Sequence, residues 1–336
     1  MSSRAERAHA VHVLNPGGRD AERSFDAGPG TPADPGHPPV NFHAYAACTG
    51  GTFFRDASRV PPGSAVIVLL RPRHLDAAIR DVHRLKKSKC KVALSIKEAG
   101  AAQISENFSR PERWAKLQLI AQQVDFYIAP TRAAAILLRG AGCPEGIVMP
   151  PPYPLDFPAW DFSMPLTQRK GIFVGTREFR VCHRHHLLAL AALAADGHAA
   201  TVLHCGKRWE RKLIERISGA FRIVGGPLPY PDYLHLMGAH RVVFQLDGGM
   251  VPGQVAGDAL LCRMPCVGGS GEVERVALCA NDLAGGTDWP GLCGQLKKLL
   301  QEDEQWVDVV GRSQSAAANE LSFSAGGAKL RDIFKI

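Results

Sequence analysis

The chain has 336 residues, of which 46% are hydrophobic and 21% are charged. This length exceeds one ordinary domain, and the composition is that of a globular protein rather than a disordered or fibrous one. The formal net charge of +8 favours anionic partners such as phosphorylated small molecules, acidic lipid surfaces or nucleic acid.

Several classes of protein are disfavoured by the sequence. No run approaches the roughly 18 apolar residues that a membrane-spanning helix needs, and the first residues lack the apolar core of a secretory signal. The nine cysteines have no regular spacing, which is typical of a reducing compartment. We therefore expect a cytoplasmic protein, with a peripheral membrane contact left open. Zinc-ligand pairs, helix-turn-helix spacing and basic stripes with interleaved aromatics are all missing, so nucleic acid is not favoured as a partner.

The first half alternates short apolar strands with helices. In chain order, we predict strands at 10–16, 64–72, 91–100 and 124–131, and helices at 74–89, 110–123 and 132–142. The Gly- and Pro-rich segment 26–51 has neither a helical nor a strand period, which is typical of a functional or disordered loop.

The second half repeats the same alternation after a break. The Pro-rich segment 149–168 cannot continue a helix or a sheet, so we predict an interdomain hinge there. The later predicted strands are 171–176, 200–206, 221–226, 241–246 and 265–269, and the later helices are 184–197, 210–219, 230–240, an apolar run ending before Pro265, and 289–311. The pattern predicts an α/β protein with two doubly wound, Rossmann-like domains facing a cleft.

Four segments of the second half share their order and spacing with a known family. They are FVGTREFRVCHRHHLLALAAL, TVLHCG, RIVGGPLPYPDYLHLMGAHRVVFQL and DALLCRMPCV followed by GGSGEVER. From about Lys170 to Gly285 they resemble the nucleotide-binding domain of GT-B glycosyltransferases, most of all the retaining family 4. The resemblance implies an acceptor-side domain over 1–155, a hinge over 156–168, a nucleotide-sugar-binding domain over 169–318, and a helix over 319–336 that returns toward the first domain.

The family carries two carboxylates near its donor sugar. In this chain Asp258 takes the place of the second one, which implies a hydrogen-bond acceptor for the donor's ribose hydroxyls. The place of the first falls on Met250, which has no carboxyl group, and Asp247 is a candidate stand-in. The alternative interpretation of Asp258 is a helix N-cap or a surface carboxylate.

Two Gly-containing turns are candidate phosphate sites, because phosphates bind fixed cations and free backbone N–H groups. The first contains Gly175, with Arg177 and Arg180 predicted to stabilise the leaving diphosphate and Arg184 as a third cation. Alternatively, these arginines only begin a solvated helix.

Further along the chain, three positions complete the predicted donor-binding set. They are Gly253 before the apolar helix, and Gly269 and Glu272 in the turn GGSGEVER. The alternative is an ordinary Gly-rich turn.

A metal reading of the segment CHRHH is not favoured. Consecutive residues of a helix point in different directions, so few pairs among Cys182, His183, His185 and His186 face a common ion. We expect neither an obligatory metal nor another cofactor.

Acceptor-side residues are predicted at the ends of two strands of the first half. Asn15, Gly17 and Gly18 belong to the segment that ends the first strand, and Lys97 and Glu98 lie at the C-terminal edge of the strand at 91–100. Residues at such strand ends bind an acceptor or assist proton transfer. The alternatives are an ordinary turn and a surface ion pair.

The resulting hypothesis is a glycosyltransferase that moves a sugar from a UDP-, GDP- or ADP-linked donor to an acceptor hydroxyl, with retention. The acceptor is a glycan, a lipid or a small molecule. A binding protein of the same fold without turnover is the alternative that Met250 favours. A nucleotide-sugar epimerase is the other.

Overall fold

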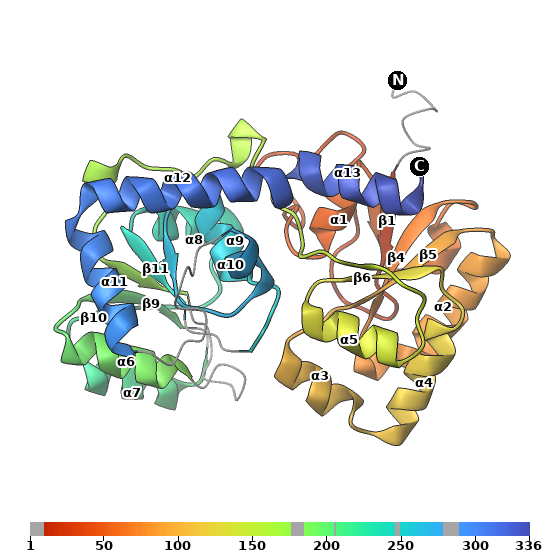
Figure 1. Cartoon of the computed structure of the whole chain (residues 1–336), viewed down its shortest axis with the longest axis horizontal. Helices are drawn as coiled ribbons and strands as arrows, with labels where there is room; N and C mark the ends of the chain where they lie inside the picture. The colour runs from red at the N-terminus through yellow and green to blue at the C-terminus, as the bar shows by residue number, and fades with distance from the viewer. Residues whose placement is uncertain (1–9, 176–184, 205, 246–248, 278–288) are drawn as a thin grey trace. The chain divides into compact units, whose positions relative to one another are not determined.

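The computed structural model describes residues 10–175, 185–204, 206–245, 249–277 and 289–336 (Figure 1). The chain forms two compact units, Met1–Asp156 together with Leu321–Ile336, and Phe157–Glu320. Each unit contains a largely parallel sheet with its own covering helices.

The sheet of the first unit is ordered β2-β3-β1-β4-β5-β6-β7. Its strands are β1 (Val11–Leu14), β2 (Arg23–Ser24), β3 (Thr52–Phe54), β4 (Ala65–Leu70), β5 (Lys91–Ile96), β6 (Phe126–Ala129) and β7 (Ile147–Val148). All pairings are parallel except that of β2 with β3. The helices are α1 (His43–Ala47), α2 (Leu75–Lys87), α3 (Ala101–Phe108), α4 (Pro111–Ala121), α5 (Arg132–Gly140) and α13 (Phe323–Phe334).

Strand β4 shows why this sheet reads as continuous apolar runs. Its alternate residues Val66, Val68 and Leu70 pack in one core with α2, α4 and α5. The residues between them pack in a second core with α1 and α13. Because both faces of the strand are covered, all six positions are buried and apolar.

The expectation of an irregular loop over 26–51 is wrong at α1. All five residues of this helix are buried, and the hydroxyl of Tyr45 donates a hydrogen bond to the carbonyl oxygen of Met149 at 2.6 Å. A helix this short has no room for an amphipathic period, so its burial depends on partners far away in the chain. Helix α3 was also not expected from the sequence.

The sheet of the second unit is ordered β10-β9-β8-β11-β12 and is parallel throughout the described residues. Its strands are β8 (Ile172–Val174), β9 (Ala200–His204), β10 (Phe221–Gly225), β11 (Val242–Phe244) and β12 (Cys266–Val267). The helices are α6 (His185–Ala195), α7 (Arg208–Ile217), α8 (Tyr230–Gly238), α9 (Gln254–Leu261), α10 (Glu272–Val276), α11 (Trp289–Gln301) and α12 (Asp303–Glu320).

The order in which strands are added reverses near the centre of each sheet. In the second unit the chain runs outward from β8 through β9 to β10, then returns to β11 on the other side of β8 (Figure 1). In the first unit β1 lies between β3 and β4 in the same manner. Ligands of open α/β sheets bind at the carboxyl ends of the strands at such a switch point.

The segment predicted as a hinge is part of a compact unit. The Pro-rich residues 157–168 belong to the second unit, where Trp160 is 1% exposed. None of the described helices combines the length and the apolar composition needed to cross a membrane.

Candidate functional site

The switch point of the second unit lies at the ends of β8 and β11. Gly175 directly follows β8, and a Cβ atom there would lie 2.5 Å from Cγ1 of Val255 in α9. Gln245 directly follows β11 and is 5% exposed, and its Oε1 has no hydrogen-bond partner among the described residues. A buried amide oxygen at a strand end is a ready hydrogen-bond acceptor for a ligand. Gly175 was predicted from the sequence, and Gln245 was not.

Asp258 lies inside α9 and is 1% exposed, whereas the N-cap of that helix is Gly253. The interpretation of Asp258 as an N-cap or surface carboxylate is therefore wrong. Its Oδ1 accepts a hydrogen bond of 2.6 Å from the hydroxyl of Tyr230, at the start of α8. A buried carboxylate needs such a donor, because burial without one is costly. Tyr230 was not predicted as a site residue from the sequence.

Replacing Tyr230 by Phe removes this donor. We expect the free energy of unfolding to fall by about 1.5–3 kcal/mol, the usual range for a hydrogen bond to a charged group. Denaturant unfolding of Tyr230→Phe, Asp258→Asn and the double variant measures it as a double-mutant cycle. If Tyr230→Phe lowered the free energy of unfolding equally in the parent protein and in Asp258→Asn, the two side chains would not be coupled.

Three glycines surround the carboxylate of Glu274, which is 2% exposed. A Cβ atom at Gly253 or Gly271 would lie 2.1 Å from Oε2 of Glu274, and one at Gly269 would lie 2.7 Å from Oε1. Gly253 and Gly269 have φ angles of +94° and +85°, where L residues are strained. At Gly253 and Gly269, both predicted from the sequence, the backbone therefore lies in close contact with a buried carboxylate. Glu274 itself was missed, because in the sequence it resembles any helical glutamate.

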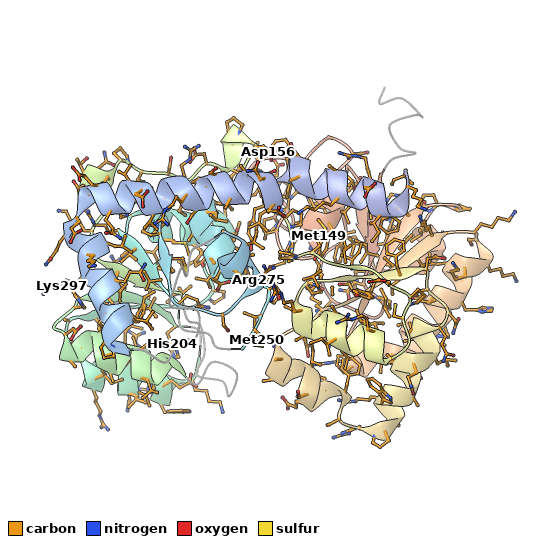
Figure 2. The ribbon with its side chains drawn as sticks, in the orientation of Figure 1. Met149, Asp156, His204, Met250, Arg275 and Lys297 are labelled. Carbon is orange, nitrogen blue, oxygen red and sulfur yellow. The ribbon has the colours of Figure 1, made fainter. Side chains whose placement is uncertain are left out.

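The remaining described donor-side residues lie on the same turns. Glu272, predicted to bind the donor, is 7% exposed and accepts a hydrogen bond of 2.8 Å from Nε of Arg275. Met250 is 57% exposed, has a φ angle of +51°, and donates its backbone N–H to Oγ of Ser270 at 3.2 Å (Figure 2). A left-handed backbone at a non-Gly residue is uncommon and is often found at functional sites.

Several predicted residues lie outside the described part of the chain. They are Arg177, Arg180, Arg184 and Asp247, together with Cys182 and His183 of the CHRHH segment. Within the described residues, no group of three or more His, Cys, Asp and Glu is arranged to hold a metal ion.

The switch point of the first unit is formed by the loop after β1. Asn15 is fully buried, and a Cβ atom at Gly18 would lie 2.0 Å from its Nδ2. Gly17 has a φ angle of +63°, and a Cβ atom there would lie 2.8 Å from Nδ1 of His74. Glycine at both positions lets the loop turn back over the end of β1. The structure therefore brings the three predicted residues of this loop together.

Lys97 and Arg71 directly follow the neighbouring strands β5 and β4, and both form ion pairs with Oδ2 of Asp20. Burial acts to raise the pKa of Asp20, but the hydrogen bond from Lys97 and the charges of Lys97 and Arg71 outweigh it, so this pKa is lowered. Burial likewise lowers the pKa of Lys97 against the opposing effect of Asp20. Glu98 instead accepts a hydrogen bond of 2.9 Å from Asn107 in α3. Arg71 directly follows β4 as Lys97 directly follows β5, but Arg71 was not predicted as a site residue from the sequence.

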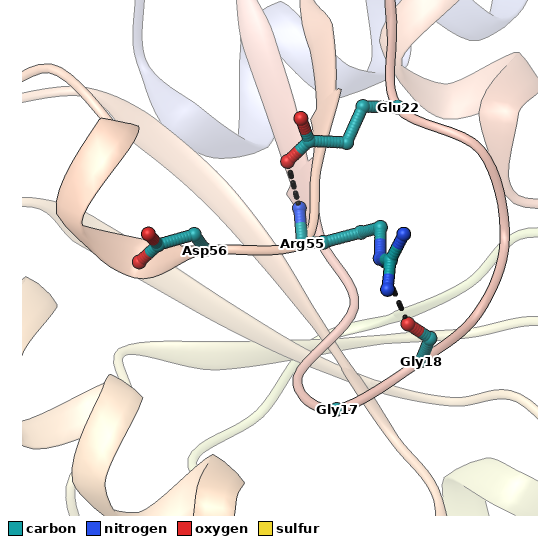
Figure 3. Close-up of a pocket in the computed structure, with 5 residues that line it drawn as sticks. All are labelled: Gly17, Gly18, Glu22, Arg55 and Asp56. Atoms are coloured by element: carbon teal, nitrogen blue, oxygen red, sulfur yellow. Dashed lines mark hydrogen bonds between the residues drawn. The ribbon is translucent and has the colours of Figure 1, made fainter.

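A pocket of about 360 Å³ adjoins this loop and is lined by Gly17, Gly18, Glu22, Arg55 and Asp56 (Figure 3). Nε of Arg55 donates to the carbonyl oxygen of Gly18 at 2.9 Å, and Oε1 of Glu22 accepts from the backbone N–H of Arg55 at 2.8 Å. Both charged side chains thus help to shape the pocket around the glycine turn.

The fold is shared with solved structures of low sequence identity. An Escherichia coli structure described as trehalose-6-phosphate bound with UDP-2-fluoro glucose has a TM-score of 0.61 and 12% identity, over 80% of this chain and 72% of the other. HepE of Anabaena, in complex with UDP and glucose, has a TM-score of 0.56 and 11% identity, over 81% and 78%. The trehalose-6-phosphate synthase OtsA has a TM-score of 0.61 and 12% sequence identity, over 80% of this chain and 71% of the other. The chain has the GT-B fold. In this fold each unit is one Rossmann-like domain, as the strand orders indicate. No family model and no curated protein matches the chain.

Proposed function

We propose that the chain is a glycosyltransferase that transfers a sugar from a nucleotide-diphosphate donor to an acceptor hydroxyl, with retention. The observation that carries this proposal is the set of polar groups at the β8/β11 switch point: Gln245, Asp258 and the glycine turns around Glu274. They lie in a GT-B fold whose solved relatives are described with UDP or UDP-2-fluoro glucose bound.

In the proposed mechanism the second unit binds the donor. Asp258 accepts hydrogen bonds from the ribose hydroxyls. The hydroxyl of Tyr230 either keeps its hydrogen bond to Oδ1 of Asp258 beside them or is displaced by them. The backbone around Gly175 and Gly269 approaches the diphosphate closely, because neither residue carries a side chain. Arg177 and Arg180 stabilise the departing diphosphate, so the chemistry needs no obligatory metal. The acceptor binds the first unit. Its hydroxyl oxygen attacks the anomeric carbon from the face that the diphosphate leaves, and its proton passes to the departing diphosphate as the bond between sugar and diphosphate breaks.

The proposal predicts a nucleotide-dependent rise in thermal stability. We expect one of UDP, GDP and ADP, at about 100 times its dissociation constant, to stabilise the protein by about 2.7 kcal/mol, a shift of several degrees. Asp258→Asn should abolish the shift, whereas Asp232→Asn, which alters an exposed carboxylate of α8, should leave it intact. A folded protein that responds to none of the nucleotides contradicts the donor site.

Met250 favours a second candidate, a nucleotide-binding protein without turnover. Its side chain is exposed and offers no carboxylate at the position where the family has one. Release of free sugar from the nucleotide sugar distinguishes the two, because only an enzyme hydrolyses the donor slowly in the absence of acceptor. Retention is tested by the anomeric configuration of the transferred sugar, read from its NMR coupling constant.

A further inference from the structure

One carboxylate oxygen at the edge of the first sheet accepts three hydrogen bonds. Oδ2 of Asp20 accepts from Nδ2 of Asn15 at 2.5 Å, from a terminal guanidinium nitrogen of Arg71 at 3.2 Å, and from Nζ of Lys97. Two of the three donors are cationic, which makes this a charge-assisted arrangement typical of a bound oxyanion.

The three donors come from adjacent parallel strands. Asn15 directly follows β1, Arg71 directly follows β4 and Lys97 directly follows β5, and these strands pair in that order. The β1/β4 boundary is the switch point of this sheet, where the fold places ligands. A carboxylate of the chain itself therefore occupies the place where a ligand is expected.

Asp20 does not use the full capacity of these donors. Two cations face a single carboxylate, and the donor Nε of Arg71 has no hydrogen-bond partner among the described residues. Asn15 is fully buried, so its orientation toward Asp20 is fixed by packing. A group with more oxygens and a larger charge than a carboxylate would pair with these donors more completely.

The donors and the acceptor differ in how firmly they are held. Arg71 and Lys97 follow strands whose residues are buried and paired on both sides. Asp20 lies between β1 and β2 on the loop that contains Gly17 and Gly18, beside the pocket of Figure 3. Moving Asp20 aside therefore requires a rearrangement between Gly18 and Ala21, which are held by hydrogen bonds from Arg55 and His43, while the cations at the strand ends stay in place.

We propose that Asn15, Arg71 and Lys97 form a binding site for a phosphate group of the acceptor, and that Asp20 occupies this site as an internal competitor until the acceptor displaces it. The proposal rests on the proposed function, since it assigns the substrate class of the acceptor side. It makes the acceptor a phosphorylated molecule and gives Asp20 a role in excluding uncharged ones.

The test is calorimetric titration of the full chain with inorganic phosphate at low ionic strength. With an internal competitor, the apparent affinity equals the intrinsic affinity multiplied by the fraction of molecules in which the site is free. Asp20→Asn should therefore bind phosphate about tenfold more tightly than the parent protein. Lys97→Gln and Arg71→Gln should each weaken binding by at least a similar factor. Matched controls are Asp76→Asn and Lys116→Gln, which alter a more exposed ion pair of the same unit and should change nothing.

A second measurement covers the case in which Asp20→Asn does not fold. In the unaltered protein, phosphate should shift the side-chain amide resonances of Asn15 as its bond to Asp20 is replaced. Unchanged Asn15 resonances at saturating phosphate, or equal affinities of Asp20→Asn and the parent, would overturn the proposal and leave Asp20 a structural ion pair. UDP binding, measured in the same variants, should be unaffected by Lys97→Gln. A parallel loss of UDP binding would assign the site to the donor instead, while failure of UDP binding in every protein would count against the proposed function alone.

Discussion

Two buried histidines, His43 and His12, are expected to reduce the free energy of unfolding by about 4 kcal/mol, about 2 each, when the pH falls from 7.5 to 5.0. Burial, together with the neighbouring His37, lowers the pKa of His43 to about 3, and burial lowers that of His12 to about 4. Below pH 6.5 the unfolded chain therefore binds protons at these two histidines, whereas the folded chain does not bind them until the pH is much lower. The stabilisation is complete above about pH 6.5 and is lost as the pH falls toward these lowered values.

The geometry explains why His43 stays neutral. Its ring is stacked between those of His37 and Phe53, at centroid distances of 3.8 and 3.7 Å. Its Nε2 is 2.8 Å from the carbonyl oxygen of Ala21, so this nitrogen carries the hydrogen in the neutral ring. A charged imidazole here would be desolvated between two rings, beside a second histidine.

Urea unfolding at several pH values measures the pH dependence of the free energy of unfolding. The variant His43→Phe shows how much of this dependence comes from His43. Phe preserves the stacked ring but does not titrate, so in this variant the decrease in the free energy of unfolding between pH 7.5 and 5.0 should be smaller by about 2 kcal/mol. His83→Gln, at an exposed position of α2, is the matched control and should keep the full dependence. If His43→Phe and the parent protein show the same slope against pH, the lowered pKa of His43 is not the cause.

The strands and the edge residues were predictable for a physical reason. Strands buried on both faces appear in the sequence as apolar runs, uninterrupted in β4 and broken only by Ser95 after Lys91 in β5. The polar residue that follows such a run lies at the carboxyl edge of the sheet. Lys97 was found in this way, whereas Arg71, which directly follows β4, was not. The glycines were found because turns that approach other groups closely require them.

The partners of these residues were not predictable, because they are set by contacts between distant parts of the chain. Asp20 meets Lys97 across 77 positions, and Tyr230 meets Asp258 across 28. Helix α1 is stabilised by the bond from Tyr45 to Met149, 104 positions away. No local pattern distinguishes these polar residues from solvent-exposed ones, so the tertiary structure is needed to identify them.

Replacing Gly253 by Ala is expected to lower the free energy of unfolding by about 3 kcal/mol and to remove the nucleotide-dependent thermal shift. The cost has two physical parts: the left-handed backbone at φ +94°, and the approach of the new Cβ to 2.1 Å from Oε2 of the buried Glu274. Either the carboxylate or the loop 249–253 must move. The loop is hydrogen-bonded to the start of α10 through Val251 and Pro252, so its displacement also moves the turn that contains Gly269.

Two glycines of the same unit separate these parts. Gly226 has a φ angle of +80° with nothing within 4 Å of its hypothetical Cβ, so Gly226→Ala measures the backbone cost alone, about 1 kcal/mol. Gly219 also has open space and no positive φ, so Gly219→Ala should be neutral within about 0.5 kcal/mol. A Cβ atom at Gly253 would also lie 2.9 Å from Cβ of Val273 in α10, so the excess cost of Gly253→Ala over Gly226→Ala measures how tightly Glu274 and Val273 are held together. An excess near zero would mean that this carboxylate moves freely, and that the glycine turns need not be rigid to bind a donor.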